Sequence, residues 1–438
     1  MSGIRAVRAD VSIGVLSWIS PPMAVRLMFR HRVYAIEWLT EDVGELWTAE
    51  APENYRQHLP RSPRGYMRQL ITLYGSPMSL YTGRVRSYFI KAGVPFREVA
   101  PVSDHYEDVV LPKAGGRRSM PTVELPDGQV IRDSVAIVDH FEAELGSPFT
   151  PTTPRQQTVS LLFDLIGAEG LLRPALHYRW RFPENEALVH HHFAEITPRN
   201  APWQFTLQGR IERMQQACID LGVPVDRVEL VESLYLGLLR KLDTHFANYP
   251  YLLGSKPCIG DFGLIAPMYA HLGRDPKPLS LMHEHGIHVL RWVERMNRPD
   301  HDLGAAHDTH EAFLSNDEIP ETLQDVLRHI ALDLVPETRA ACDEVNKWID
   351  AQSELKAGTT AERSVGDMAT FQVEGTSMTA FVQPYRFYLL KRLQNLVADC
   401  SAASEQIVQL MTSVNMAELL GMKLTRDIGR AGNLEVWQ

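Results

Sequence analysis

The chain has 438 residues, of which 45% are hydrophobic and 22% charged, and its net charge is −10 at neutral pH. This length exceeds one ordinary domain and predicts two or three. The acidic balance, without a basic stripe, argues against nucleic-acid binding through counterion release. No apolar run reaches the roughly 18–20 residues that a membrane-spanning helix needs.

The four cysteines, Cys218, Cys258, Cys342 and Cys400, are far apart and form no CxxC pair. This spacing indicates scattered core residues and no disulfide framework. A reducing compartment fits that pattern, so we expect the protein in the cytoplasm.

Residues 1–66 give no clear structural pattern. Pro21 and Pro22 end the apolar stretch Val11–Trp18, and early arginines with few acids faintly resemble a transit peptide. The stretch Pro52–Gly65 is rich in Pro, Arg and polar residues, as linkers are. We expect a poorly ordered N-terminal extension, or one that results from a start codon placed too early.

The pattern sharpens at residues 67–148, where short apolar strands alternate with helical stretches. Pro126-Asp127-Gly128 is a hairpin turn signal between the last two strands. The order strand, helix, strand, loop, strand, strand, helix predicts an α+β sheet covered by helices. The expected strands are Leu70–Tyr74, Phe96–Val99, Thr122–Leu125 and Gln129–Arg132, and the expected helices are Thr82–Ala92 and Ser134–Leu145.

Residues 149–300 are helical in pattern throughout, and Asp226 is expected to cap one of these helices. Residues 301–438 form a mainly helical C-terminal extension with one hairpin that turns at Glu374-Gly375. The expected elements of the extension are helices at Thr322–Leu334, Arg339–Ala351 and Tyr385–Ala398 and the hairpin at Phe371–Val382.

Ser79 lies between the first strand and the first helix of residues 67–148. Free amides and the helix dipole at such a helix start favour negative charge, and cysteine thiols there ionise well below their usual pKa of about 8.5. A serine hydroxyl at this place can donate a hydrogen bond to a bound thiolate. Taken alone, however, Ser79 is also a normal N-cap residue.

Two further motifs flank the next strands. Met120-Pro121 opens a strand, and a cis bond there would turn the backbone N–H and C=O of Met120 outward toward a peptide ligand. Asp133-Ser134 begins a helix, where a hydroxyl and free amides suit a carboxylate and Asp133 can meet an ammonium group. Taken alone, each motif is better explained by plain capping than by ligand binding.

Together, the three motifs resemble the glutathione transferase superfamily over about residues 67–300. Gly75-Ser-Pro-Met-Ser79, followed by Thr82-Gly-Arg84-Val, is similar to the active-site segment of the serine-type phi and theta classes. The resemblance implies a thioredoxin-like N-terminal domain with a four-stranded mixed sheet and helices at 67–148, and an all-helical domain at 149–300. Asp261, just after Cys258, is similar to the family's buried capping residue in the helical domain.

The resemblance also implies roles for single residues. Ser79 would activate the thiol of glutathione, Met120 with Pro121 would pair with its cysteinyl backbone, and Asp133 and Ser134 would hold its γ-glutamyl group. Glutathione would be a co-substrate, and a homodimer would be expected unless the added C-terminal residues block it.

The sequence departs from the family at Ser119, where many members have a Lys or Gln that binds the glycyl carboxylate. Arg117 or Arg118 is a candidate substitute, although both can also be solvated loop residues. Tyr178 and Trp180 are candidates for an acceptor pocket between the two domains, or are ordinary core aromatics.

Histidines cluster at His190-His191-His192, but no HExxH motif accompanies them, and consecutive histidines point in different directions on a helix. We therefore expect solvated polar residues and no metal.

Two hypotheses remain. The first is a glutathione transferase of the detoxification type, whose thiolate attacks a small hydrophobic electrophile; lyase, dehalogenase and isomerase variants of this chemistry stay open. The second is a non-catalytic, transferase-like scaffold or interaction module, because a fold alone does not decide function.

Overall fold

The computed structural model describes residues 28–30, 33–35, 70–198, 203–300, 302, 311–400 and 402–438. The chain divides into two compact units, Met1–Ser62 and Pro63–Gln438. In the first unit the described residues form an antiparallel hairpin of β1 (Met28–Arg30) and β2 (Val33–Ala35). The other residues of 1–66, for which we expected a poorly ordered or wrongly started extension, lie outside the described residues. Within the described part of the chain, no helix combines the length and apolar content needed to cross a membrane.

A four-stranded mixed sheet opens the second unit, with the order β4-β3-β5-β6. Its strands are β3 (Ile71–Tyr74), β4 (Phe96–Val99), β5 (Thr122–Glu124) and β6 (Val130–Arg132). β4 runs parallel to β3, whereas β5 runs antiparallel to both of its neighbours. Between β4 and β5 lie the π-helical turn η3 (Tyr106–Val110) and the short helix α3 (Leu111–Lys113).

Helices α2 (Leu80–Ala92) and α4 (Ser134–Leu145) complete this domain and pack against each other. α2 begins two residues earlier than predicted, because Ser79 is its N-cap. It ends at Gly93, whose φ of 65° is the left-handed conformation that glycine adopts without strain. The predicted α+β class with a thioredoxin-like domain is confirmed.

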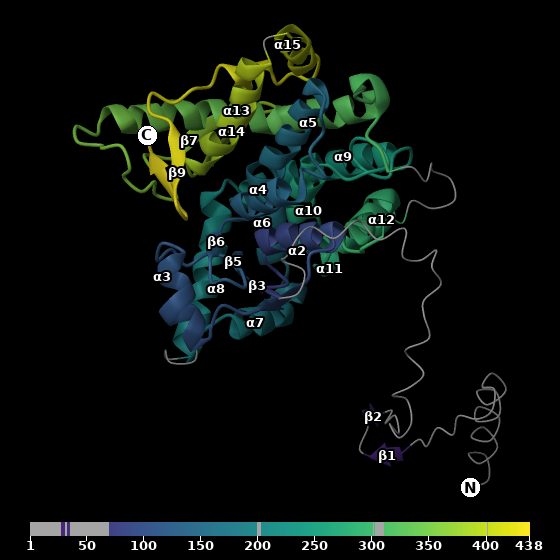
Figure 1. Cartoon of the computed structure of the whole chain (residues 1–438), viewed down its shortest axis with the longest axis vertical. Coiled ribbons are helices and arrows are strands. Elements are labelled where there is room, and N and C mark those ends of the chain that lie inside the picture. The colour runs from purple at the N-terminus through teal and green to yellow at the C-terminus, as the bar shows by residue number, and fades with distance from the viewer. Residues whose placement is uncertain are drawn as a thin grey trace, which may run out of the picture. The chain divides into compact units, whose positions relative to one another are not determined.

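The following region is helical, as predicted, and α10 lies at its centre, packed against both α2 and α5 (Figure 1). Its helices are α5 (Pro154–Leu165), the π-helical turn η4 (Ile166–Gly170), α6 (Leu172–Trp180), α7 (Glu186–Glu195), α8 (Trp203–Asp220), α9 (Val228–Phe246), α10 (Ile259–Ala270), α11 (Pro276–His285) and α12 (Ile287–Met296), with 3₁₀ turns η5 (Pro183–Asn185) and η6 (Val225–Arg227).

Two predicted caps in this region have different outcomes. Asp226 does not cap α9: it lies within η6, the residue before α9 is Arg227, and the Asp226 carboxylate pairs with that arginine. Asp261 does act as a cap, since its buried carboxylate accepts the Cys258 N–H at 2.9 Å. The same carboxylate accepts the Trp292 indole N–H at 2.9 Å, which ties α12 to the start of α10.

The C-terminal extension joins two of the expected helices and adds a short helix (Ser404–Ser413) and a second hairpin to the expected elements. Its elements are the 3₁₀ turn η7 (Ser315–Asp317), α13 (Glu321–Asp350), β7 (Ala369–Val373), β8 (Thr376–Ala380), α14 (Tyr385–Asp399), α15 (Ser404–Ser413), the 3₁₀ turn η8 (Ala417–Leu420), β9 (Ile428–Ala431) and β10 (Leu434–Trp437). The two helices expected on either side of Pro336 are one continuous helix. The hairpin of β7 and β8 is present as predicted, whereas the β9–β10 hairpin was not predicted.

The extension is packed into the same core as the two preceding regions. Figure 1 shows α13 above α9, and the contacts confirm that α13 packs on α9 and that α14 and α15 pack on α5. One apolar cluster of buried residues extends from Ile71 in β3 to Trp437 in β10. α13 continues through Pro336 because its apolar face is buried along this core, which outweighs the lost backbone hydrogen bond.

Buried ion pairs hold α13 and α14 to the helical region. Glu337 in α13 pairs with Arg173 of α6 at 3.0 Å and with Arg386 of α14 at 2.9 Å, and all three side chains are at most 5% exposed. Burial alone would raise the pKa of Glu337, but the attraction of the two guanidinium groups outweighs burial and holds the pKa below its usual value.

We predict that Glu337→Ala destabilises the protein by about 3–5 kcal/mol, because the buried guanidinium of Arg386 loses its carboxylate and that of Arg173 keeps only Asp333. The folded-state pKa of Glu337 is lowered. Its contribution to the free energy of unfolding should therefore be complete above the usual pKa of a glutamate and be lost as the pH falls from there through the lowered pKa. Urea denaturation at several pH values measures both effects. Glu321→Ala, at an exposed side chain on the same helix, is the control and should change stability by less than about 0.5 kcal/mol. Equal stability of the two variants would contradict the prediction.

Candidate active site

The strand register brings the three predicted motifs to one edge of the sheet. Tyr74, the last residue of β3, pairs with Thr122, the first residue of β5, and Thr122 pairs with Arg132, the last residue of β6. The segments that continue from these ends carry Ser79, Met120-Pro121 and Asp133-Ser134. A ligand that spans this edge can therefore contact all three.

Ser79 is partly exposed and ends the loop before α2. Its Oγ accepts the backbone N–H of Thr82 at 3.3 Å, so Ser79 is an N-cap residue of α2. No residue in the described part of the chain accepts a hydrogen bond from the Ser79 hydroxyl. The same group can therefore cap α2 through its lone pair and donate its hydrogen to an anion.

The peptide bond between Met120 and Pro121 is cis. The carbonyl of Pro121 accepts the backbone N–H of Asp133 at 3.3 Å, which links this loop to the start of α4. Among the described residues, none hydrogen-bonds to the backbone N–H or C=O of Met120. Both groups are therefore available to pair with the backbone of a bound peptide.

Asp133 is the N-cap of α4 and has a φ of 86°, an uncommon conformation for a residue other than glycine. Its Oδ1 accepts the N–H groups of Val135 at 3.0 Å and Ala136 at 3.2 Å, and also the Tyr385 hydroxyl of α14 at 2.9 Å. Arg430 of β9 lies 3.8 Å from the same oxygen. All of these contacts fall on Oδ1, so Oδ2 is left for a cationic group.

Ser134, the first residue of α4, is 3% exposed, and within the described residues its side chain has no hydrogen-bond partner. Tyr385 and Arg430 are site residues that the sequence did not reveal. The helix that begins at Tyr385 was predicted, but no local pattern indicates that its first turn contacts Asp133, more than 200 residues earlier in the chain.

Both predicted candidates for the glycyl carboxylate are already paired, which corrects that expectation. Arg117 donates to Glu435 of β10 at 3.1 Å and to the carbonyl of Ala361 at 2.6 Å. Arg118 forms a two-point contact with the carboxylate of Glu107. The positive charges of Arg117 and Arg118 are therefore already balanced by carboxylates of the chain itself, Glu435 and Glu107.

Glu435 is the centre of a wider arginine network. Its carboxylate accepts Arg132 at 2.6 and 2.7 Å and Arg430 at 2.7 Å, in addition to Arg117. Burial raises the pKa of Glu435, but Arg132 above all, and then Arg430, hold it below its usual value. This carboxylate fixes the β9–β10 hairpin beside β6 and the Asp133 cap.

The two candidate acceptor-pocket aromatics differ. Tyr178 is 1% exposed and lies between the rings of Phe182 and Tyr235, so it is a core residue and lines no open pocket, which corrects that expectation. Trp180 packs edge-on against Phe193, in the cluster that contains Met78, next to Ser79. Trp180 therefore stays a candidate. Two hollows of the described structure, one between α6, α9 and α13 and one between α13 and β7, are lined by none of the predicted site residues.

A buried carboxylate that sequence reasoning missed, Glu169, lies in the π-helical turn η4. It is 4% exposed, and its Oε2 has no hydrogen-bond partner. Burial raises its pKa to about 7; Arg386 opposes this increase, whereas Glu337 and Asp133 add to it. Breaks in α-helical geometry of this kind often occur at functional sites, which is the one structural signal that singles out Glu169.

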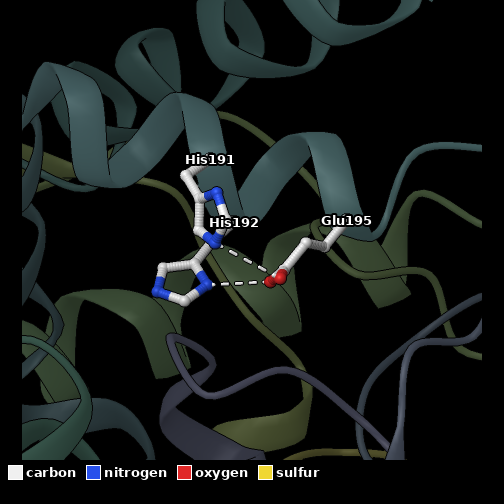
Figure 2. A group of neighbouring side chains, drawn as sticks. All are labelled: His191, His192 and Glu195. Atoms are coloured by element: carbon white, nitrogen blue, oxygen red, sulfur yellow. Dashed lines mark hydrogen bonds and ion pairs between the residues drawn. The ribbon is translucent and has the colours of Figure 1, made fainter. Parts of the chain in front are cut away.

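The histidine run lies on α7, and His191, His192 and Glu195 are the described residues whose ligand atoms come within 4.8 Å of one another (Figure 2). Glu195 contacts His191 at 3.3 Å and His192 at 3.0 Å. His191 and Glu195 are exposed, whereas metal-binding histidines are usually held by buried hydrogen-bond partners. Helical spacing accounts for these contacts without an ion.

Comparison with known proteins identifies the first domain. Residues 73–149 match the family model described as glutathione S-transferase, N-terminal domain. The sheet topology agrees with this match, so the predicted superfamily is confirmed for residues 73–149, the part of the chain that the family model covers. No curated protein matches the chain.

Solved structures similar to the chain include a serine-to-cysteine mutant of poplar glutathione transferase F1, at 14% identity and a TM-score of 0.31, covering 60% of this chain and 98% of that one. A glutathione S-transferase from Methylobacterium radiotolerans, in complex with glutathione sulfonate, has 16% identity, a TM-score of 0.34 and coverage of 57% and 100%. The β-etherase LigF from Sphingobium sp. strain SYK-6 has 16% identity, a TM-score of 0.36 and coverage of 52% and 95%. Similarity at this level is too low to transfer a reaction.

We predict that the stability of the protein falls as the pH rises through about 7, in part because Glu169 must then be buried as an anion. The folded-state pKa of Glu169 is raised. Its contribution to the free energy of unfolding is therefore complete below the usual glutamate pKa and is lost above the raised pKa. Between these two limits the free energy of unfolding changes by about 3 kcal/mol. Thermal unfolding of Glu169→Gln across this range should show a shallower decline than the unsubstituted protein. Parallel curves would contradict the prediction.

We also predict that dialysis against EDTA leaves glutathione binding and thermal stability unchanged, because the His191, His192 and Glu195 contacts are accounted for without an ion. Metal analysis before dialysis and calorimetry after it test this expectation. A loss that Zn²⁺ restores in the unsubstituted protein, but not in His191→Ala, would contradict it.

Proposed function

We propose that the chain is a glutathione-dependent enzyme of the serine type, in which Ser79 stabilises the thiolate of bound glutathione. The observation that carries this proposal is that polar groups with unused hydrogen-bonding capacity converge at one edge of the sheet. These are the Ser79 hydroxyl, the Met120 backbone and Oδ2 of Asp133.

The chemistry follows from the helix start. The first amides of α2 and its dipole favour negative charge beside Ser79, and the hydroxyl donates a hydrogen bond to sulfur. Both effects lower the pKa of the thiol, so more of the bound glutathione is in the nucleophilic form at neutral pH. The thiol proton passes to solvent, and the thiolate then attacks an electrophilic carbon of a small hydrophobic molecule. The sulfur–carbon bond forms as the bond from that carbon to its leaving group breaks, and the leaving group departs with the electron pair.

The peptide part of glutathione would be held by the other two motifs. Met120, next to Pro121, would pair with the cysteinyl backbone, and Asp133 with Ser134 would bind the γ-glutamyl group. Trp180 is the proposed contact for the electrophile. Ether cleavage, dehalogenation and isomerisation use the same thiolate, and a detoxification role in the cytoplasm is the physiological setting we propose.

The alternative is a transferase-like scaffold without catalysis. Its support comes from the extension, since Tyr385 occupies one lone pair of Asp133, and Glu435 neutralises Arg117. Failure to bind glutathione at millimolar concentration would favour this alternative over the enzyme.

We predict that bound glutathione ionises below the usual thiol pKa of about 8.5 and that Ser79→Ala moves the ionisation back toward that value. The catalytic efficiency kcat/KM of Ser79→Ala should fall about a hundredfold, as expected when one hydrogen-bond donor to a developing anion is removed. Thiolate absorbance followed through a pH titration measures the first effect, and a conjugation assay the second. Ser404→Ala, on the surface helix α15, is the matched control. Full activity of Ser79→Ala would remove Ser79 from the mechanism.

A further inference from the structure

The segment from Thr359 to Arg363 lies across the loop that precedes Pro121. Its backbone pairs with β10 on one side: Trp437 donates to Thr359 at 2.9 Å, and Ala361 donates to Glu435 at 2.8 Å. From the other side, Arg117 donates to the carbonyl of Ala361 at 2.6 Å. The segment is therefore a fixed part of the structure on both sides.

Arg363 follows directly and reaches the same loop. Its guanidinium donates to the carbonyl of Arg118 at 3.0 Å, two residues before Met120. This neutral carbonyl is the hydrogen-bond partner found for Arg363, and no carboxylate within the described residues pairs with it. The side chain is also accessible to solvent.

The surroundings of Arg363 are cationic. Partial desolvation first, and then the positive charges of Arg117, Arg132 and Arg213, lower the pKa of Arg363, and Glu435 offsets this effect only in part. Arg117 and Arg132 share the carboxylate of Glu435, so that anion is already committed. A guanidinium held among like charges without its own counter-ion is a ready site for a carboxylate.

The position of Arg363 relates it to the candidate active site. Tyr81 stands two residues after Ser79, and burial, followed by the charges of Glu169 and Asp133, raises its pKa; Arg84 and Arg363 oppose that increase. Arg363 therefore acts on the hydroxyl of Tyr81, which donates to the carbonyl of Ala168 at 2.9 Å. Its own hydrogen bond to Arg118 fixes Arg363 at the loop of Met120, on the sheet edge where the three motifs converge.

We propose that Arg363, supplied by the C-terminal extension, binds a carboxylate of the molecule held at this edge. The proposal rests on the proposed function. A carboxylate can come from glutathione itself, whose glycyl end carries one, or from an anionic acceptor. The shared chemistry is a two-point contact between guanidinium and carboxylate, which Arg117 and Arg118 cannot make while they are paired with Glu435 and Glu107.

The test compares the full-length protein with Arg363→Gln by isothermal titration calorimetry at low ionic strength. Glutathione should bind the variant about tenfold more weakly, as expected for the loss of a hydrogen bond to a charged group. Arg363→Lys should recover part of this loss. Arg328→Gln, at a partly exposed arginine of the extension that pairs with Glu321, is the matched control and should bind like the unsubstituted protein.

Two ligand pairs identify the source of the carboxylate. γ-Glutamylcysteine lacks the glycyl carboxylate, so its affinity should be equal in both proteins if Arg363 binds that group. If the acceptor supplies the carboxylate, Arg363→Gln should weaken S-(4-carboxybenzyl)glutathione but not S-benzylglutathione.

Equal affinity of both proteins for all four ligands, with thermal unfolding unchanged, would refute the assignment of Arg363 and leave the proposed function standing. Absence of glutathione binding to the unsubstituted protein would refute both.

Discussion

The carboxylate of Glu435 is the contact on which the candidate site depends. It is 5% exposed and balances Arg117, Arg132 and Arg430, three cations that would otherwise repel one another beside β6. Through it, β10 is fixed against the sheet, and the strand-like segment that ends at Arg363 is fixed against β10. One buried anion thus joins the last residues of the chain to the loop before Pro121.

The parts of the fold that could be predicted from sequence are those with local causes. β3 is a short apolar run, the other strands of the sheet are short segments bounded by turn signals, and Ser79 and Gly93 mark the two ends of α2 with the residue types that such ends require. The three site motifs were found for the same reason. Their convergence needs only the antiparallel register of β5, which a mixed sheet of this order supplies.

What could not be predicted depends on contacts between distant segments. Nothing near Arg117 in the sequence indicates that its partner is Glu435, more than 300 residues later, so a solvent-facing or ligand-binding role was the natural expectation. α13 passes through Pro336 because of what it packs against, which no local rule contains. The β9–β10 hairpin was not predicted, although Gly432 marks its turn, and it is held by distant contacts: Asn433 accepts the backbone N–H of Arg132, and Glu435 pairs with Arg117.

The extension also bears on assembly. α5 is largely buried within a single chain, since α10 packs on it together with α14 and α15 of the extension. An amphipathic helix that is covered in this way offers little apolar surface to a second copy, because its buried area is already used. A homodimer, which the family resemblance implies, stays a prediction, and α5 offers little apolar surface for it. The same packing places Tyr385, at the start of α14, against Asp133, so the segment that covers α5 also completes the edge where we propose that glutathione binds.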